Sequence, residues 1–164
     1  MAEKSGLDMS ISVFVHYREL NSVKYEAAEG RLKIEVALRG LVDEKVLTEF
    51  VDKTKNSLYL YYNLSQVKPV LSDVEYTTQA GITLIRFYRD INSLSESEVD
   101  LFVIMLRDSF SSLLIIDDTN DVDSEERYTR EIKRNLLHNH KSDITNPKNF
   151  FGYRDHGTMF VFDK

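Results

Sequence analysis

The sequence contains no cysteine and no tryptophan, and its 164 residues include only two prolines and six glycines. Without cysteine the chain has no disulfide framework, no thiolate metal site and no cysteine nucleophile, and it is compatible with a reducing compartment. The glycines are scattered singly, so the sequence contains no glycine-rich phosphate loop. Ser109, Ser111 and Ser112 lie close together but lack the Gly-x-Ser-x-Gly pattern of a nucleophile elbow.

The sequence also lacks long apolar runs and an excess of positive charge. Its longest unbroken apolar run, Leu101–Leu106, is far too short to cross a bilayer, and Met1–Asp8 contains no apolar signal core. We therefore expect a cytoplasmic protein without membrane association. The net charge of −6 argues against general nucleic-acid binding, because a duplex-binding protein needs a positive face to displace the counterions of the phosphates.

What the chain does contain is typical of one globular α+β domain. Hydrophobic residues make up 42% and charged residues 29%, and nine tyrosines with nine phenylalanines supply core volume. We expect a mostly antiparallel sheet with two or three packed helices. Helices are predicted at about 44–55, 95–110 and 124–138, and strands at Ile11–Leu20, Arg31–Arg39, Ser57–Asn63, Asp73–Thr78, Ile82–Ile91, Leu113–Ile116, Phe150–Arg154 and Thr158–Phe162.

The domain is expected to span residues 10–164, preceded by a flexible tail at 1–9 and ending in a polar extension at 118–164. The stretches 11–63 and 73–117 share the order strand, strand, capped helix, strand. This order is compatible with two related halves produced by internal duplication. Hairpin-plus-helix units are also common in α+β folds, and the side chains barely match between the halves, so both interpretations stay open.

Two predicted helices begin with clear local signatures. Asp43 is a suitable N-cap for the first. For the second, Ser95 and Glu98 form a capping box, and Leu94 and Val99 form the matching hydrophobic staple. The helix that follows Ser95 is apolar almost all round, which predicts that it is buried within the fold or in an oligomer interface.

A candidate metal site lies in the last third of the chain. Carboxylates at the end of a predicted strand and imidazoles at the end of a predicted helix could hold Mg²⁺, Mn²⁺ or Zn²⁺ and activate a water. The candidate ligands are Asp117, Asp118, His138, His140 and Asp143. The alternative is structural, with the acids capping a helix and the histidines complementing its C-terminal dipole. The structural alternative is favoured, so we expect no cofactor. A divalent metal ion bound by these residues is the alternative to be tested.

Two groups of side chains are candidates for binding. Tyr59 and Tyr61 lie on a predicted strand and would form a partner patch on an uncovered sheet face, because aromatic residues are enriched in interface cores. If helices cover both faces, these tyrosines are core residues. Near the C-terminus, Tyr153, Arg154 and His156 could stack bases and hold phosphates, or could belong to a hairpin packed on the core.

The function favoured by the sequence is non-enzymatic, because the usual catalytic motifs are missing. We expect a small acidic adaptor, regulatory or assembly protein that acts through contacts with a partner protein or with a second copy of itself, as in a homodimer. One alternative is a metal-dependent hydrolase or nuclease that uses the acidic and histidine residues above. Another is a nucleic-acid or nucleotide-binding module that uses the C-terminal cations and aromatics.

Overall fold

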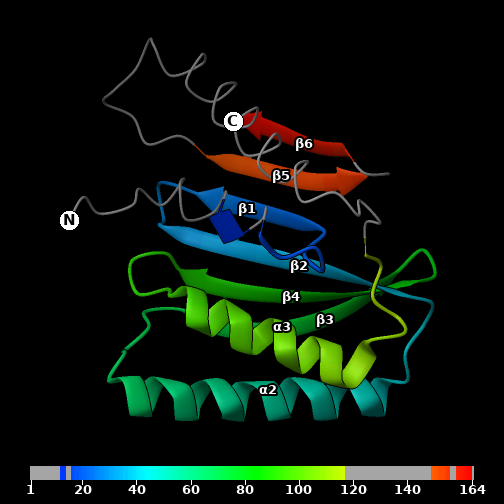
Figure 1. Ribbon diagram of the computed structural model, residues 1–164, viewed down its shortest axis with the longest axis horizontal. Helices are drawn as coiled ribbons and strands as arrows, with labels where there is room; N and C mark the ends of the chain where they lie inside the picture. The colour runs from blue at the N-terminus through cyan, green and yellow to red at the C-terminus, as the bar shows by residue number, and fades with distance from the viewer. Residues whose placement is uncertain (1–11, 14–15, 117–148, 156–157, 164) are drawn as a thin grey trace.

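The protein is an α+β domain built on one antiparallel sheet with two long helices (Figure 1). The computed structural model describes residues 12–13, 16–116, 149–155 and 158–163. The strand order is β3-β4-β2-β1-β5-β6. The elements are β1 (Ser22–Glu26), β2 (Arg31–Arg39), α2 (Glu44–Ser65), β3 (Ser72–Gln79), β4 (Ile82–Asp90), α3 (Glu96–Phe110), β5 (Phe150–Asp155) and β6 (Thr158–Asp163).

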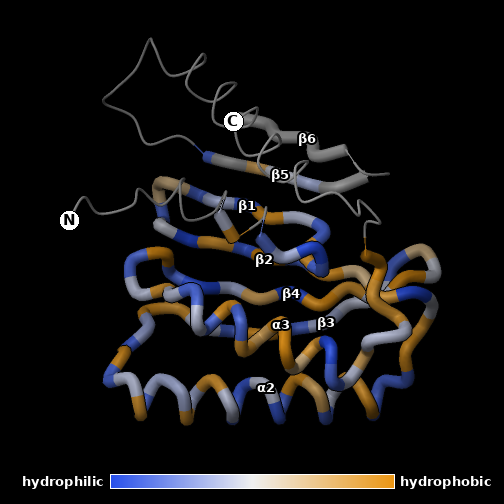
Figure 2. The backbone as a smooth tube through the Cα atoms, in the orientation of Figure 1, coloured by the Kyte–Doolittle hydropathy of each residue, from blue (hydrophilic) through white to orange (hydrophobic). Residues whose placement is uncertain are grey.

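The central strands alternate between a buried and a half-exposed side. On β2, Leu32, Ile34, Val36 and Leu38 are buried, and the residues between them lie toward the other side, as the sequence predicts. Figure 2 shows this alternation as a change of hydropathy along the strands. One sheet face therefore belongs to the core, and the other carries mainly charged and polar side chains.

The helices α2 and α3 run antiparallel to each other and enclose the core together with the sheet. Their relative direction follows from two contacts: the Phe50 and Phe110 rings are 4.9 Å apart, and the Tyr62 hydroxyl donates to Glu98 Oε1 at 2.5 Å. Phe102 on α3 packs against Phe87 on β4, with ring centroids 4.8 Å apart. In Figure 1, α3 crosses in front of β3 and β4, and α2 lies beside it, at the β3 side of the sheet. Among the residues that the structure describes, no helix is both long and apolar enough to cross a bilayer.

Both predicted N-caps are confirmed. The Asp43 carboxylate accepts from the Lys45 N–H at 3.0 Å, and the Ser95 hydroxyl accepts from the Glu98 N–H at 3.3 Å. In a capping box the Glu98 carboxylate would accept from the Ser95 N–H. Here it binds the Arg89 guanidinium in the core instead. The burial of α3 is less complete than its composition suggests, since Ile104 on its outer side is 49% exposed.

The strand predicted at Ser57–Asn63 is wrong, because α2 continues through it to Ser65. Leu58 and Tyr62 are four residues apart and extend the buried stripe that begins with Leu47 and Phe50. The β-branched and aromatic content of a segment is a weak guide when a helical burial pattern continues through it. The helix ends at Gln66, which adopts a left-handed conformation with φ 56°.

The strand predicted at Ile11–Leu20 is also wrong. Residues 12–13 and 16 are helical, the Tyr17 N–H donates to the Val13 carbonyl at 3.3 Å, and β1 begins only at Ser22. Val13, Tyr17 and Leu20 are all buried and follow the spacing i, i+4, i+7 of one helix face.

The C-terminal parts of the two proposed halves also differ from the prediction. In place of a strand at 113–116, Leu114 forms an isolated bridge with Leu38, supported by the Arg39 N–H to Leu113 carbonyl bond at 2.8 Å. The order strand, strand, helix therefore occurs twice, but the final strand of neither half is present as predicted. The terminal hairpin is confirmed as β5 and β6, and β5 pairs with β1. The predicted tail at 1–9 and helix at 124–138 lie outside the described residues.

One buried hydroxyl in the core has no hydrogen-bond partner. Thr54 lies on the inner side of α2, is fully buried, and its Oγ1 is unsatisfied. Replacing Thr54 with valine keeps the shape and removes the desolvated hydroxyl, so we expect the free energy of unfolding to rise by about 1 kcal/mol in urea denaturation. Thr48→Val is the control, because the Thr48 hydroxyl bonds the Glu44 carbonyl at 2.9 Å and the Tyr76 hydroxyl at 3.2 Å. Lower stability of Thr54→Val than of wild type would contradict the prediction.

Candidate functional site

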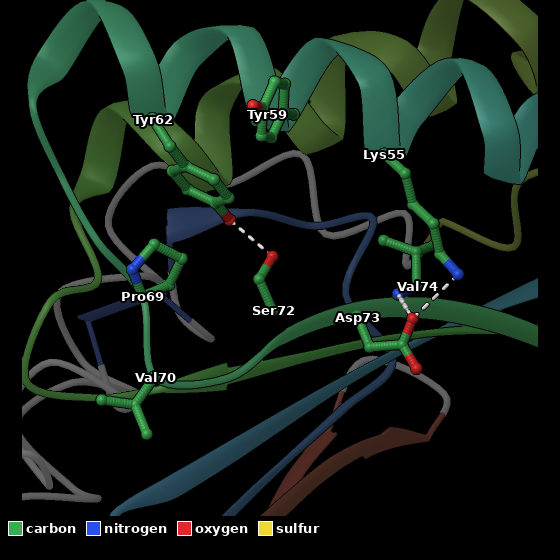
Figure 3. A pocket seen from close by; sticks show the side chains of 8 residues that line it. All are labelled: Lys55, Tyr59, Tyr62, Pro69, Val70, Ser72, Asp73 and Val74. Atoms are coloured by element: carbon green, nitrogen blue, oxygen red, sulfur yellow. Dashed lines mark hydrogen bonds and ion pairs between the residues drawn. The ribbon is translucent and has the colours of Figure 1, made fainter.

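A pocket of about 380 Å³ lies between α2 and the beginning of β3 (Figure 3). Its size is within the range of sites that accept a small ligand or a large side chain. The lining residues come from the C-terminal half of α2, from the link that follows it and from the first residues of β3: Lys55, Tyr59, Tyr62, Pro69, Val70, Ser72, Asp73 and Val74. The wall is therefore largely aromatic and aliphatic, with a few polar groups.

The polar groups of the pocket bond mainly to one another. Lys55 on α2 and Asp73 on β3 form an ion pair, with Nζ and Oδ1 2.9 Å apart. The oxygens of Tyr62 and Ser72 are 2.7 Å apart, and because Tyr62 donates to Glu98, Ser72 is the donor of this bond. Both interactions join α2 to β3 and can be followed in Figure 3. Two interactions between α2 and β3 therefore connect opposite walls of the pocket, and Pro69 and Val70 of the link complete it.

Large apolar side chains are exposed around the pocket and over the last two turns of α2. Tyr59 is 68% exposed, Leu60 58%, Leu64 77% and Val70 92%. We call these four residues the α2 apolar patch. Single exposed apolar residues are normal on any protein, but a group beside a pocket is typical of a contact surface.

Behind the pocket lies a buried ion cluster made of Arg89, Glu98, Asp90 and Tyr62. Arg89 is 1% exposed and Glu98 is fully buried. The guanidinium donates from Nε and Nη2 to the two Glu98 oxygens, the second bond measuring 2.9 Å, and from Nη1 to Asp90. The Arg89 Cζ lies 5.4 Å from the centre of the Tyr62 ring. A buried charge pair of this kind is tolerated only when its hydrogen bonds are satisfied, as they are here.

The environment of this cluster changes the proton affinities of its members. Burial alone would raise the pKa of Asp90, but bonds from Ser93 and from the Leu71 N–H, together with the charge of Arg89, hold that pKa below its usual value. Burial and then the hydrogen bond to Glu98 raise the pKa of Tyr62. Burial would lower the pKa of Arg89, but Glu98 outweighs it. Each shift favours the state with a charged arginine and aspartate and a neutral tyrosine.

The predicted binding residues are not brought together. Tyr59 and Tyr61 lie on a helix rather than on a strand: Tyr59 lines the pocket, and the Tyr61 hydroxyl lies 2.7 Å from Ser95 Oγ at the start of α3. Tyr153 and the backbone of Arg154 belong to β5, which three strands separate from β3. His156 lies outside the described residues. Tyr59 and Tyr153 therefore cannot contribute to one site.

The proposed metal ligands Asp117, Asp118, His138, His140 and Asp143 all lie outside the described residues, so that site stays a prediction. Within the described ranges, no three His, Asp or Glu side chains are grouped so that they could hold a metal ion.

Apart from Tyr59, sequence reasoning missed the residues that shape the pocket and the ion cluster. Arg89 carried a usable signal, because it continues the buried parity of Thr83, Ile85 and Phe87 along β4. An arginine on the buried side of a strand requires a partner, but the capping pattern at Ser95 predicts a role for Glu98 only at the start of the helix. Lys55 and Asp73 carried no such signal, because their contact depends on how α2 is placed against β3.

In comparisons with known proteins, no family model, no curated protein and no solved structure matches this chain. Function is therefore inferred from the geometry alone.

Proposed function

We propose that this protein acts through protein–protein contacts in the cytoplasm, as an adaptor, regulatory or assembly protein rather than as a catalyst. The contact surface is the α2 apolar patch with the pocket beside it. The partner is another protein or a second copy of the chain.

One observation carries this proposal: Tyr59 and Val70 are strongly exposed and line a pocket, and two further exposed leucines, Leu60 and Leu64, lie on the same end of α2. A partner side chain that enters the pocket would contact the apolar parts of Tyr59, Tyr62, Pro69 and Val70. Burying apolar area gives about 25 cal/mol per Å², and aromatic residues in pockets dominate many interfaces. The proposed contact surface also includes polar groups, because the charged side chains of Lys55 and Asp73 line the pocket and are each about half exposed.

The proposal predicts that Tyr59→Ala weakens partner binding by about tenfold or more, because an aromatic residue at the rim of a pocket is a typical interface hot spot. The protein is tagged, purified from the cells that make it and cross-linked, and its complexes are quantified beside sedimentation of the pure chain. Leu60→Ser with Leu64→Ser tests the part of the patch that lies outside the pocket lining.

Leu41→Ser is the matched control. Leu41 is 70% exposed, as Tyr59 is, but it precedes the start of α2 and is separated from Tyr59 by most of a helix about 33 Å long. We expect this variant to bind as wild type does. A wild-type protein that neither self-associates nor forms a complex, or equal loss in Leu41→Ser, would overturn the proposal.

A further inference from the structure

One side of the sheet is covered by neither α2 nor α3. Phe102 of α3 packs on Phe87 of β4, with ring centroids 4.8 Å apart. The hydroxyl oxygens of Thr48 on α2 and Tyr76 on β3 are 3.2 Å apart. Phe87 and Tyr76 lie on the same side of the sheet as the buried Val74, so both helices lie on this side. Residues of the opposite parity form the other side, which we call the outer face.

The outer face has an excess of positive charge, although the chain as a whole has 27 acidic and only 21 basic residues. On β1 to β4 it carries the basic residues Lys24, Arg31, Lys33, Arg39 and Arg86 and the acidic residues Glu26, Glu35 and Glu75. Two more carboxylates share this parity, but Asp73 pairs with Lys55 on α2 and Asp90 pairs with the buried Arg89. A local excess of this kind attracts anions even on an acidic protein.

A row of four side chains crosses the strands on the outer face. Tyr88 on β4 pairs with Lys33 on β2, and Lys33 pairs with Lys24 on β1. Lys24 pairs in turn with Phe151 on β5. Residues that lie directly opposite each other on antiparallel strands have their side chains on the same side of the sheet. The order across the sheet is therefore aromatic, basic, basic, aromatic.

The two lysines of this row are only partly balanced by acids. Lys24 lies directly opposite Lys33, and like charges in that position repel each other. The Lys24 Nζ is 3.1 Å from Glu26 Oε1, but Glu26 also bonds Arg31 at 2.6 Å. Within the described ranges Lys33 forms no ion pair. An anion above the row would therefore relieve the repulsion between the lysines.

The aromatic side chains at the two ends of the row are partly exposed. Because β2 and β1 separate β4 from β5, and neighbouring strands are about 4.8 Å apart, Tyr88 and Phe151 are placed about 14 Å apart. The Tyr88 hydroxyl donates to Glu75 Oε1 at 2.7 Å, which holds this ring at the β3 side. Tyr153, a binding residue predicted from the sequence, lies beside Phe151 with ring centroids 5.9 Å apart. Cations between aromatic rings are typical of surfaces that bind single strands.

We propose that the outer face binds single-stranded nucleic acid, with bases on Tyr88 and Phe151 and the phosphates between them on Lys33 and Lys24. The two rings are much farther apart than stacked neighbouring nucleotides, which are about 3.4 Å apart, so they receive bases that are not adjacent. An acidic peptide would be attracted by the lysines alone, whereas a nucleic acid uses the lysines and both rings. A duplex keeps its bases stacked inside, which favours a single strand on an open sheet.

The inference goes beyond the proposed function and does not depend on it, because the outer face and the α2 apolar patch lie on opposite sides of the sheet. The probe is a fluorescently labelled oligothymidylate of about ten nucleotides, and its binding to the full chain is measured by fluorescence anisotropy over a range of salt concentrations. We expect binding at low salt that weakens as salt is added, because bound phosphates release counterions.

Lys33→Gln tests the phosphate contact. We expect weaker binding and a salt dependence of log K against log salt that is shallower by about 0.7, the contribution of one phosphate contact on a single strand. Lys53→Gln is the matched control, since Lys53 is an exposed lysine on α2 and the change in net charge is the same. This control should bind as wild type does.

Tyr88→Leu tests base stacking. We expect binding about tenfold weaker with the salt dependence unchanged, because a stacking partner is lost and no charge is altered. Tyr88→Phe keeps the ring and loses only the bond to Glu75, so its affinity should exceed that of Tyr88→Leu by a similar factor. Circular dichroism checks that both variants are folded, and Lys33→Gln still tests the proposal if Tyr88→Leu is not.

Four results would overturn the proposal: no binding of the wild-type protein at low salt, equal losses in Lys33→Gln and Lys53→Gln, equal affinities of the folded Tyr88→Leu and Tyr88→Phe variants, or competition by polyglutamate as strong as that by unlabelled oligothymidylate. The last result would assign the outer face to an acidic protein segment instead. Since none of these readouts involves the α2 apolar patch, failure here leaves the proposed protein contact standing, and the experiment on Tyr59 decides that contact separately.

Discussion

Replacing Glu98 with alanine is expected to lower the free energy of unfolding by about 3–5 kcal/mol, because it leaves the Arg89 charge buried without its main partner. Arg89 is 1% exposed and cannot reach water without opening the space between α3 and the sheet. Tyr62 would lose its acceptor as well. Domains of this kind are stable by about 5–15 kcal/mol in total, so the variant should be close to unfolding. Urea denaturation at neutral pH measures the loss.

A double variant separates the lost charge partner from the lost space. In Arg89→Met with Glu98→Leu, both charges are removed and the volume is largely kept, so we expect most of the stability to return. Asp90 would keep the N–H groups of Val70 and Leu71 as donors, together with the Ser93 hydroxyl. Glu49→Ala, an exposed acid on α2, is the control and should change stability by less than about 0.5 kcal/mol. A loss in Glu98→Ala no larger than that in Glu49→Ala would refute the prediction.

Replacing Phe102 with alanine is expected to cost a similar amount, about 3–5 kcal/mol, for a different reason. Phe102 is fully buried between α3 and β4, and its ring lies 4.8 Å from that of Phe87. The substitution removes apolar area from the core and leaves a cavity that the rigid sheet cannot close. Guanidinium chloride denaturation should show a lower midpoint with an unchanged slope.

The matched control for this substitution is Ile104→Ala on the same helix. Ile104 is 49% exposed, so its truncation should cost well under 1 kcal/mol. Combining Phe102→Ala with Phe87→Ala measures the coupling of the two rings, which we expect to be about 0.5–1.5 kcal/mol. Equal losses in the Phe102 and Ile104 variants would mean that Phe102 does not occupy the core as described.

The elements that could be predicted are those whose side chains alternate or carry a cap. β2 follows from strict alternation, β4 follows from its apolar residues after the turn at Gly81, and the start of α3 follows from Ser95. Residues 57–63 could not be assigned in this way, because Leu58, Tyr59, Tyr61 and Tyr62 fit a strand by composition and a helix by spacing. Only the contact of Leu58 and Tyr62 with the core decides between the two.

The candidate site was predictable to a smaller extent. The sequence predicts that Tyr59 belongs to a partner surface on a strand; Tyr59 does line the pocket, but it lies on the helix α2. The residues opposite it come from β3, and their distance from α2 is set by the turn at Gln66 and the link that follows. Sequence patterns describe neighbours within a few residues, so they do not predict the distance between α2 and β3.

By itself, the sequence determined the class of this protein, the alternation of β2 and the caps of its two long helices. These features depend on neighbours within one turn or one hairpin, where side-chain spacing and capping chemistry act directly. Only the tertiary structure decided that Glu98 pairs with Arg89, that residues 57–63 are helical, and that a pocket opens beside the edge of β3. Those depend on which surfaces of distant segments meet, and burial at that contact outweighs local preference.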